Sequence, residues 1–287
     1  MPENEDKYPT QTGRRRFVKG VVGSAALSGV AAGTAATVNS ATSSGGVGGG
    51  TTQAMVIENT AGPAPRGMPI IPVEIDGGEL RGVWPEVSEV QEGGRTVQVA
   101  EEDIGGVTYS SSWFQYCGVQ QYASAQPGTE ANNAILAGGG YDWMQDVERG
   151  EPLTVDMFSD YEEWGNGVGR AGLGKPASGT WRQPEEGRGM PCQIIRSVEV
   201  ERMANGEGRY GDLPGPVRSF ISEATEDGFL AWLNKCTHFC CTPGFKNNPG
   251  SEQYNAGDRV YCQCHQSVYN PFSPTIAQFV ALPRPLE

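Results

Sequence analysis

The chain of 287 residues is poor in positive charge and has very few lysines. Five lysines stand against 34 acidic residues, and the net charge is −13. Nucleic acids need a basic face for their phosphates, so this composition excludes a nucleic acid as partner. A dense acidic surface repels itself unless concentrated salt screens the charges. The composition therefore predicts a halophile protein, with a halophilic archaeon as the expected source; an ordinary acidic soluble protein is the alternative.

No glycine-rich phosphate loop stands between a strand and a helix, so nucleotide binding has no support, and no internal repeat is present. Glycine and proline are abundant instead, with 41 and 20 residues. This content is high for a helical protein and typical of a loop-rich β protein. The length is enough for one large domain or two small ones with a buried core.

The N-terminal segment lacks the large apolar residues that fill a typical membrane span. An uncharged run over 21–38 has only five of them, although it is long enough to cross a bilayer. Arg14 and Arg15 stand just before this run, and residues 13–20 resemble a twin-arginine export signal. We therefore expect residues 1–38 to be a twin-arginine signal or a membrane anchor, with a basic disordered tail as the alternative. The chain beyond would lie on the extracytoplasmic face of the cell membrane, where disulfides persist.

Residues 39–53 are rich in glycine, serine and threonine and carry no charge. This composition predicts a flexible linker that spans roughly 20 Å and allows a head domain to swing relative to an anchor. An inert spacer is the alternative, and the composition does not distinguish the two. The folded domain is expected over 54–287.

Six segments in the body of the chain have the pattern of β-strands. They are β-branched or aromatic and are bounded by Gly, Pro, Asp or Asn. The segments are 69–75, 95–100, 192–203, 228–235, 258–264 and 277–282.

Residues 105–190 are rich in turns and are interpreted as a large, loop-rich insertion. Short helical turns are expected within 130–140 and 141–150. The aromatic residues of this segment indicate a packed unit, with a partner-docking surface as the alternative. These residues are Trp113, Phe114, Tyr116, Tyr122, Trp143, Trp164 and Trp181.

The chain has only two histidines, and each lies in a short segment with cysteines. Box 1, residues 236–241, reads CTHFCC, and box 2, residues 262–267, reads CQCHQS; together they hold five of the seven cysteines. Both boxes follow expected strands, which places them on loops at one end of a sheet. One Cys and one His from each loop could hold a tetrahedral Zn²⁺, or a [2Fe–2S] cluster with both thiolates on one iron. The four candidate ligands are Cys236, His238, Cys262 and His265.

The pattern C-T-H-x-x-C followed by C-x-C-H-x-S resembles the cluster-binding signature of Rieske iron–sulfur proteins from quinol-oxidising cytochrome bc complexes. The resemblance covers residues 228–287 and implies one [2Fe–2S] cluster on the four candidate ligands. It implies that Ser267 and Tyr269 donate hydrogen bonds to sulfur, which raises the redox potential of the cluster. It also implies a disulfide between Cys241 and Cys264 that joins the two boxes.

The resemblance further implies an all-β fold of stacked antiparallel sheets, with the cluster-binding part at 228–272. The implied function is electron transfer from a membrane quinol, within a cytochrome b-containing complex, to an extracytoplasmic c-type cytochrome or blue copper protein. His265 is the expected catalytic residue, because it would accept the quinol hydroxyl hydrogen bond and then its proton. One alternative is the Rieske subunit of an exported molybdenum oxidase or nitrate-respiration system. The other is an exported zinc-stabilised β binding module without redox activity.

The chain departs from the family pattern at positions close to the ligands. Cys240 and Gln266 stand where glycine is usual, and Gln263 stands where proline is usual. We expect Cys240 either to pack as a small apolar side chain or to compete with Cys241 for Cys264. Cys241 is favoured, because a shift of one residue should turn the sulfur away from the opposing loop.

Two further expectations concern segments outside the boxes. Cys117 and Cys192 could pair with each other or remain buried free thiols. Members of the family have a proline loop after box 2, and residues 283–285 are interpreted as its remnant. The string GPAP, which that loop often carries, stands at 62–65. It lies far before the boxes in the sequence and is interpreted as a coincidence.

Overall fold

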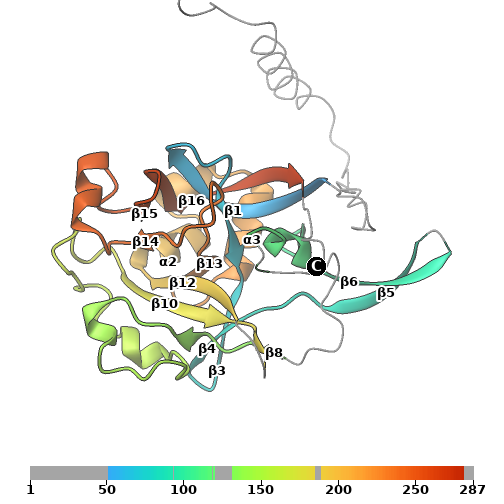
Figure 1. Cartoon of the computed structure of the whole chain (residues 1–287), viewed down its shortest axis with the longest axis horizontal. Helices are drawn as coiled ribbons and strands as arrows, with labels where there is room; N and C mark the ends of the chain where they lie inside the picture. Colours follow the sequence, from blue (N-terminus) through green and yellow to red (C-terminus); the bar gives the residue numbers. More distant parts are fainter. Residues whose placement is uncertain (1–50, 93, 118, 120–130, 185–188, 281–287) are drawn as a thin grey trace, which may run out of the picture. The chain divides into compact units, whose positions relative to one another are not determined.

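The computed structural model describes residues 51–92, 94–117, 119, 131–184 and 189–280. Its main element is a nine-stranded antiparallel sheet (Figure 1). From one edge to the other the strands are β14 (Gly244–Phe245), β15 (Val260–Cys262), β16 (Ser267–Val280), β1 (Thr51–Ala61), β2 (Met68–Ile71), β13 (Phe229–Leu233), β12 (Met190–Arg196), β10 (Lys175–Trp181) and β9 (Leu136–Ala137). The all-β prediction is confirmed in this coarse form.

Strand β1 lies inside the sheet, between β16 and β2. Its residues 54–57 are all fully buried, because both faces of the strand are covered. The strand begins at Thr51, which lies opposite Val280 in β16. The linker prediction for 39–53 is therefore wrong for its last three residues, which pair with β16. The expected signal or anchor and the rest of the linker lie outside the described residues.

Three smaller sheets accompany the main one. The hairpin of β3 (Val73–Asp76) and β4 (Glu79–Gly82) turns at two glycines with positive φ. Strands β5 (Val87–Glu92), β6 (Arg95–Ile104) and β7 (Val107–Ser110) form a three-stranded sheet, from which the β5–β6 hairpin projects (Figure 1). The third is the pair β8 (Ala131–Asn132) and β11 (Gln183–Pro184). The 3-10 helices are η1 (Ser111–Phe114), η2 (Asp142–Met144), η3 (Val155–Phe158), η4 (Gly208–Asp212) and η5 (Pro249–Tyr254).

The segment 192–203, expected as one strand, is a strand followed by a helix. β12 ends at Arg196, and helix α2 (Val198–Ala204) begins after Ser197. The Ser197 side chain accepts a hydrogen bond from the Glu199 amide, which caps the helix and stops the strand. The prediction of a strand over the whole segment was wrong for its second half, because this local cap outweighs the β-branched composition.

Helix α3 (Gly215–Ala224) follows α2 and packs through one face. Its buried residues recur at helical spacing and are Val217, Phe220, Ile221 and Ala224.

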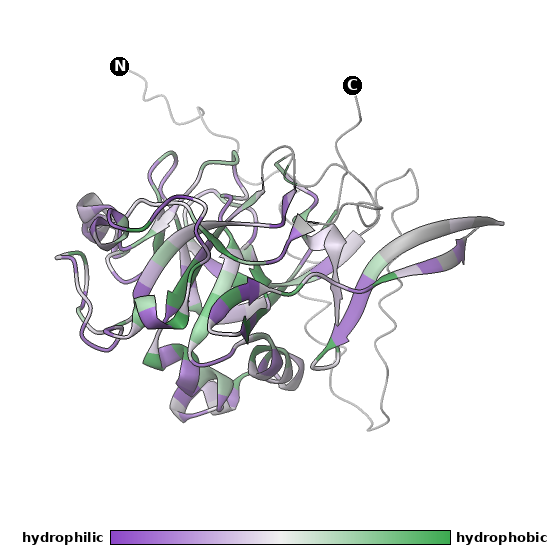
Figure 2. Ribbon diagram, turned by 90° about the horizontal axis from the view of Figure 1, so that it is seen from below, coloured by the Kyte–Doolittle hydropathy of each residue, from purple (hydrophilic) through white to green (hydrophobic). Residues whose placement is uncertain are grey.

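Hydrophobic residues gather on the central strands in Figure 2. Among the described residues, no helix has the length and apolar character needed to cross a membrane.

The segment 105–190 is part of the main core and not an insertion set apart from it. It supplies β9 and β10 to the nine-stranded sheet. Trp113, Phe114 and Trp181 are fully buried, and the last two contact each other edge to face at 5.4 Å. These aromatic residues therefore form part of a packed core and not a partner-docking surface. Tyr122 lies outside the described residues. Residues 141–150 contain η2 as expected, whereas the described part of 130–140 contains short strands and no helical turn.

Candidate metal centre

The two boxes fold into turns of the same form at one end of the main sheet. Box 1 lies between β13 and β14, and box 2 joins β15 to β16. The amide of Cys240 donates to the Cys236 carbonyl at 2.9 Å, and the amide of Gln266 donates to the Cys262 carbonyl at 2.8 Å. Both donors have a left-handed backbone, with φ of 62° and 61°. Cys240 and Gln266 are the two positions where the family pattern has glycine, so the chain keeps that backbone at a cost of about 1 kcal/mol each.

The thiols of Cys236 and Cys262 lie together in the core. Both side chains are fully buried and free of disulfides. A hydrogen bond from the Cys262 thiol, together with donation from Tyr269, lowers the pKa of Cys236 to about 5 against the opposing effect of burial. The same hydrogen bond and burial raise the pKa of Cys262. The lowered pKa favours the thiolate form of Cys236, and thiolates are the form that binds metal.

The two imidazoles lie together at the surface end of the boxes. The ring centroids of His238 and His265 are 4.7 Å apart. His265 is exposed, and His238 is half-buried. Phe239 stands beside both rings, at centroid distances of 4.3 and 5.3 Å, and is 66% exposed. The site thus has a buried sulfur side and an exposed imidazole side.

The resemblance assigned hydrogen-bond donors to Ser267 and Tyr269. The Tyr269 hydroxyl donates to the Cys236 sulfur at 3.1 Å and accepts from the Thr237 amide at 3.2 Å. Ser267 is fully buried; its hydroxyl helps to lower the pKa of Cys236, but its Oγ makes no hydrogen bond of normal geometry in the described part of the chain. The Nδ1 of His238 is also buried without a partner there. Buried polar atoms are normally satisfied, so these two orphaned atoms fit a site that receives a further group.

The spacing of the ligand atoms distinguishes two kinds of metal centre. A tetrahedral Zn²⁺ keeps its four ligand atoms about 3.5 to 4 Å apart. Within the described residues, the one trio of metal-capable side chains with all ligand atoms inside 4.8 Å is Cys241, Cys262 and Cys264, and two of these form a disulfide. No three of the four candidate ligands come this close. The four candidate ligands therefore do not form a single tetrahedral site in the described structure.

Two disulfides hold box 1. Cys241 is bonded to Cys264, the pair that the family resemblance implies. Cys240 is bonded to Cys117, across 123 residues of sequence. Both expectations for Cys240 were therefore wrong, since it neither packs as a free side chain nor competes for Cys264. The possible Cys117–Cys192 pair was also wrong, because Cys117 is bonded to Cys240; Cys192 is a free buried thiol, as the alternative expected.

The residues around Cys117 contact box 1 next to its first candidate ligand, Cys236. The Tyr116 hydroxyl donates to the Lys235 carbonyl at 2.9 Å, one residue before Cys236. The Arg66 guanidinium lies over the Tyr116 ring at 4.5 Å. Box 1 is thus attached at both ends to a segment that sequence reasoning treated as remote. The three cysteines that the family resemblance leaves without a role, an odd number, were the one signal in the sequence for this contact.

The GPAP segment lies against both boxes. A Cβ added at Gly62 would stand 2.5 Å from the Gln266 carbonyl oxygen and 2.6 Å from the Ser267 Cα. The Thr237 hydroxyl donates to the Arg66 carbonyl at 2.6 Å, which ties the end of the same loop to box 1. The string, interpreted as a coincidence because it lies far before the boxes in sequence, is thus their neighbour in the fold. Residues 283–285, expected as the remnant of the covering loop, lie outside the described residues.

We predict that Gly62→Ala destabilises the fold by about 2 kcal/mol, because the new methyl group meets backbone and the φ of +85° disfavours a side chain. Urea unfolding measures this loss. Gly77→Ala is the matched control, since Gly77 has a φ of +60° with open space around its Cβ position. An equal loss in both variants would show that backbone strain alone is responsible and that the close contact with box 2 has no effect.

No protein-family model, curated protein or solved structure matches the chain.

Proposed function

We propose that the protein is a one-electron carrier that holds a Rieske-type [2Fe–2S] cluster between the two boxes. The observation that carries the proposal is the segregation of the ligands. The two thiols are fully buried in the core, and the two imidazole rings contact each other edge to face, with His265 exposed at the surface. A cluster with both thiolates on one iron and both imidazoles on the other needs this segregation, whereas a single Zn²⁺ needs all four in one tetrahedron.

The residues of the chain have separate tasks in this proposal. When bound, the cluster supplies a one-electron acceptor of raised potential. Cys236 and Cys262 would hold its buried side, and His238 and His265 would hold its exposed side. The exposed His265 would accept the hydrogen bond of a quinol hydroxyl. Phe239 offers an apolar surface next to it, which suits an aromatic quinol ring.

The proposal extends to partners and location. The quinol would come from the membrane, within a complex that has a cytochrome b-type subunit. A c-type cytochrome or a blue copper protein would receive the electron on the extracytoplasmic face, after export by the twin-arginine route. Two disulfides support this location, because disulfides persist in oxidising compartments.

Metal analysis of the purified full-length protein tests the proposal. We expect two irons and two acid-labile sulfides per chain, consistent with a [2Fe–2S] cluster. Electron paramagnetic resonance of the dithionite-reduced protein should then show one reducible cluster. Zinc without sulfide would contradict electron transfer and favour the binding module.

We predict that Tyr269→Phe lowers the midpoint potential by about 50 mV, since it removes one hydrogen bond worth ~1 kcal/mol that favours the reduced cluster in a one-electron couple. A redox titration of the purified protein measures the shift. Tyr116→Phe is the matched control, because its hydroxyl bonds the Lys235 carbonyl and not a ligand sulfur. An equal shift in both variants would show that loss of a buried hydroxyl, and not of the sulfur hydrogen bond, sets the potential.

A further inference from the structure

Away from the metal centre, a surface cavity of about 610 Å³ gathers four arginines from four segments of the chain. They come from the loop before β10, from α2, from η4 and from the turn before β15. In order, they are Arg170, Arg202, Arg209 and Arg259. None of the lining residues belongs to either box. Such a concentration of arginine is unusual in a chain with a net charge of −13.

Most of the acidic groups in the cavity already have cationic partners. The Glu199 carboxylate accepts from Arg202 at 2.9 Å and from Arg209 at 3.3 Å. It also accepts from the Tyr210 hydroxyl at 2.8 Å. The Asp258 carboxylate lies 3.4 Å from the ammonium of Lys246, a fully buried lysine side chain. Neither carboxylate therefore needs a further cation.

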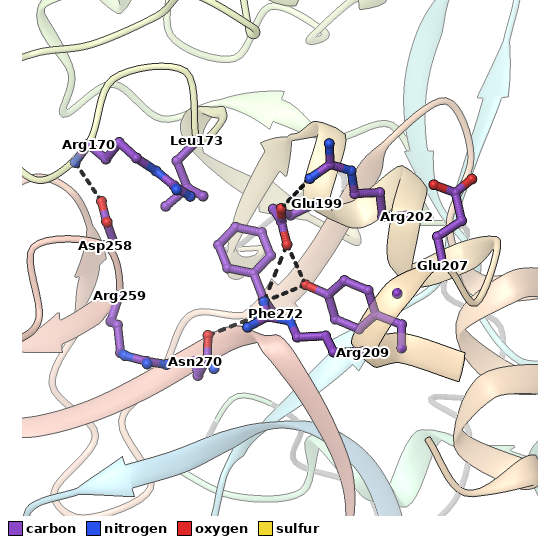
Figure 3. A pocket seen from close by; sticks show the side chains of 12 residues that line it. Arg170, Leu173, Glu199, Arg202, Glu207, Arg209, Asp258, Arg259, Asn270 and Phe272 are labelled. Carbon is purple, nitrogen blue, oxygen red and sulfur yellow. Dashed lines mark hydrogen bonds and ion pairs between the residues drawn. The ribbon is translucent and has the colours of Figure 1, made fainter. Parts of the chain in front are cut away.

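Arg170 and Arg259 are the two cations left over. The guanidinium groups of both make no hydrogen bond or ion pair with any residue that the structure describes; the Arg170 contact to Asp258 is through its backbone amide, at 2.7 Å. Their side chains lie on one side of the cavity, and Glu207 lies on the other (Figure 3). Leu173 and Phe272 add apolar surface to the lining.

We propose that this cavity binds a small organic polyanion, with phosphate or carboxylate groups held by Arg170 and Arg259. The planar guanidinium matches both groups in a bidentate manner. The volume is in the range of small-molecule sites, which run from about 300 to 1,000 Å³, and exceeds what one inorganic ion needs. The apolar residues would contact the carbon part of the ligand. This proposal does not depend on the metal centre.

Binding of two probes, pyrophosphate and citrate, to the full-length protein tests the proposal. Isothermal titration calorimetry at one fixed potassium chloride concentration is the measurement. We expect at least one probe to bind, and we expect Arg170→Ala with Arg259→Ala to weaken it by about tenfold per arginine. Arg149→Ala is the matched control, since Arg149 is an exposed arginine outside the lining and should leave the affinity unchanged.

Two outcomes would overturn the proposal: neither probe binds, or the double variant binds as tightly as the parent. Arg170→Ala alone guards against misfolding, because Arg170 is exposed and its side chain makes no hydrogen bond or ion pair with the described residues. Anionic phospholipid vesicles form a separate arm. Vesicle binding that depends on the two arginines, without binding of either probe, would assign the surface to lipid headgroups and also reject the soluble ligand. His265→Ala should bind the probes as the parent does, since the metal centre and the cavity share no residue.

Discussion

Replacing His265 with alanine is expected to leave a folded protein without iron or acid-labile sulfide. In the proposed centre two imidazoles would hold one iron, so loss of His265 would leave that iron with a single protein ligand at the exposed edge. His238 is the one other histidine in the chain, and no spare imidazole can replace the lost ligand. Iron and sulfide should fall from two per chain to almost none. Colorimetric iron and sulfide analysis measures this, together with loss of the visible absorption.

The control for this experiment is Cys192→Ala, which removes the third free thiol of the described chain. Cys192 is buried in the core on β12, outside both boxes, and burial raises the pKa of its thiol to about 12. A thiol held protonated in the core is a poor metal ligand, so iron content should be unchanged. Full iron and sulfide in His265→Ala would show that the imidazole is not a ligand and would reject the assignment of box 2.

The candidate site was predictable from sequence to the extent that it is local. Each box is six residues long, and the ligand spacing within it is set by one turn. The departures from the family pattern at Cys240 and Gln266 raised the question of whether the turn survives without glycine. Both residues adopt the left-handed backbone, and both donate the same hydrogen bond back to the first cysteine of the box. The turn therefore forms with this hydrogen bond whether or not glycine is present. Glycine would only lower the free-energy cost of the left-handed backbone.

The contacts that hold the boxes in place were not predictable, because they join segments far apart in the sequence. Cys117 bonds Cys240 across 123 residues, and Gly62 lies against Gln266 although most of the chain separates the two in sequence. Hydrophobic periodicity is a local signal and contains no information about which strands become neighbours. The pairing of β1 with β16 is what brings the GPAP segment next to box 2. The family pattern places its proline loop after box 2, so a search in that order misses a matching string that precedes the boxes.

The all-β class of the fold was predictable from the sequence, whereas several individual strands and one helix were not. β-branched and aromatic composition predicted strands at β2, β12, β13, β15 and the end of β16, but it missed β1, β10 and most of β16. The helix α2 was missed because its first residues, Val198 to Val200, read as strand, while one serine side chain decides the boundary. The turn-rich segment 105–190 was interpreted as an insertion, because two-residue strands such as β9 are too short to show alternation.

The largest stability effect outside the ligands is expected for Cys117→Ala combined with Cys240→Ala. The bond closes a loop of 123 residues, for which the chain-entropy relation gives about 5 kcal/mol at 25 °C. This loop ends where the Cys241–Cys264 loop begins, so the second disulfide does not duplicate its effect. The double variant should melt about 10 °C or more below the parent under non-reducing conditions. Differential scanning calorimetry measures this difference.

The same variant separates stability from metal binding. Its disulfide joins box 1 to the 111–117 region but contributes no ligand, so the purified double variant should contain iron and sulfide when kept well below its melting temperature. It should release them faster in a chelator, since the Tyr116 hydrogen bond to Lys235 then holds that region to box 1 without the covalent bond. Cys192→Ala is again the control for loss of a cysteine, and it should show the parent rate. A double variant with the parent melting temperature and the parent release rate would mean that Cys117 and Cys240 do not brace the box, and that the turn with its left-handed residue is sufficient alone.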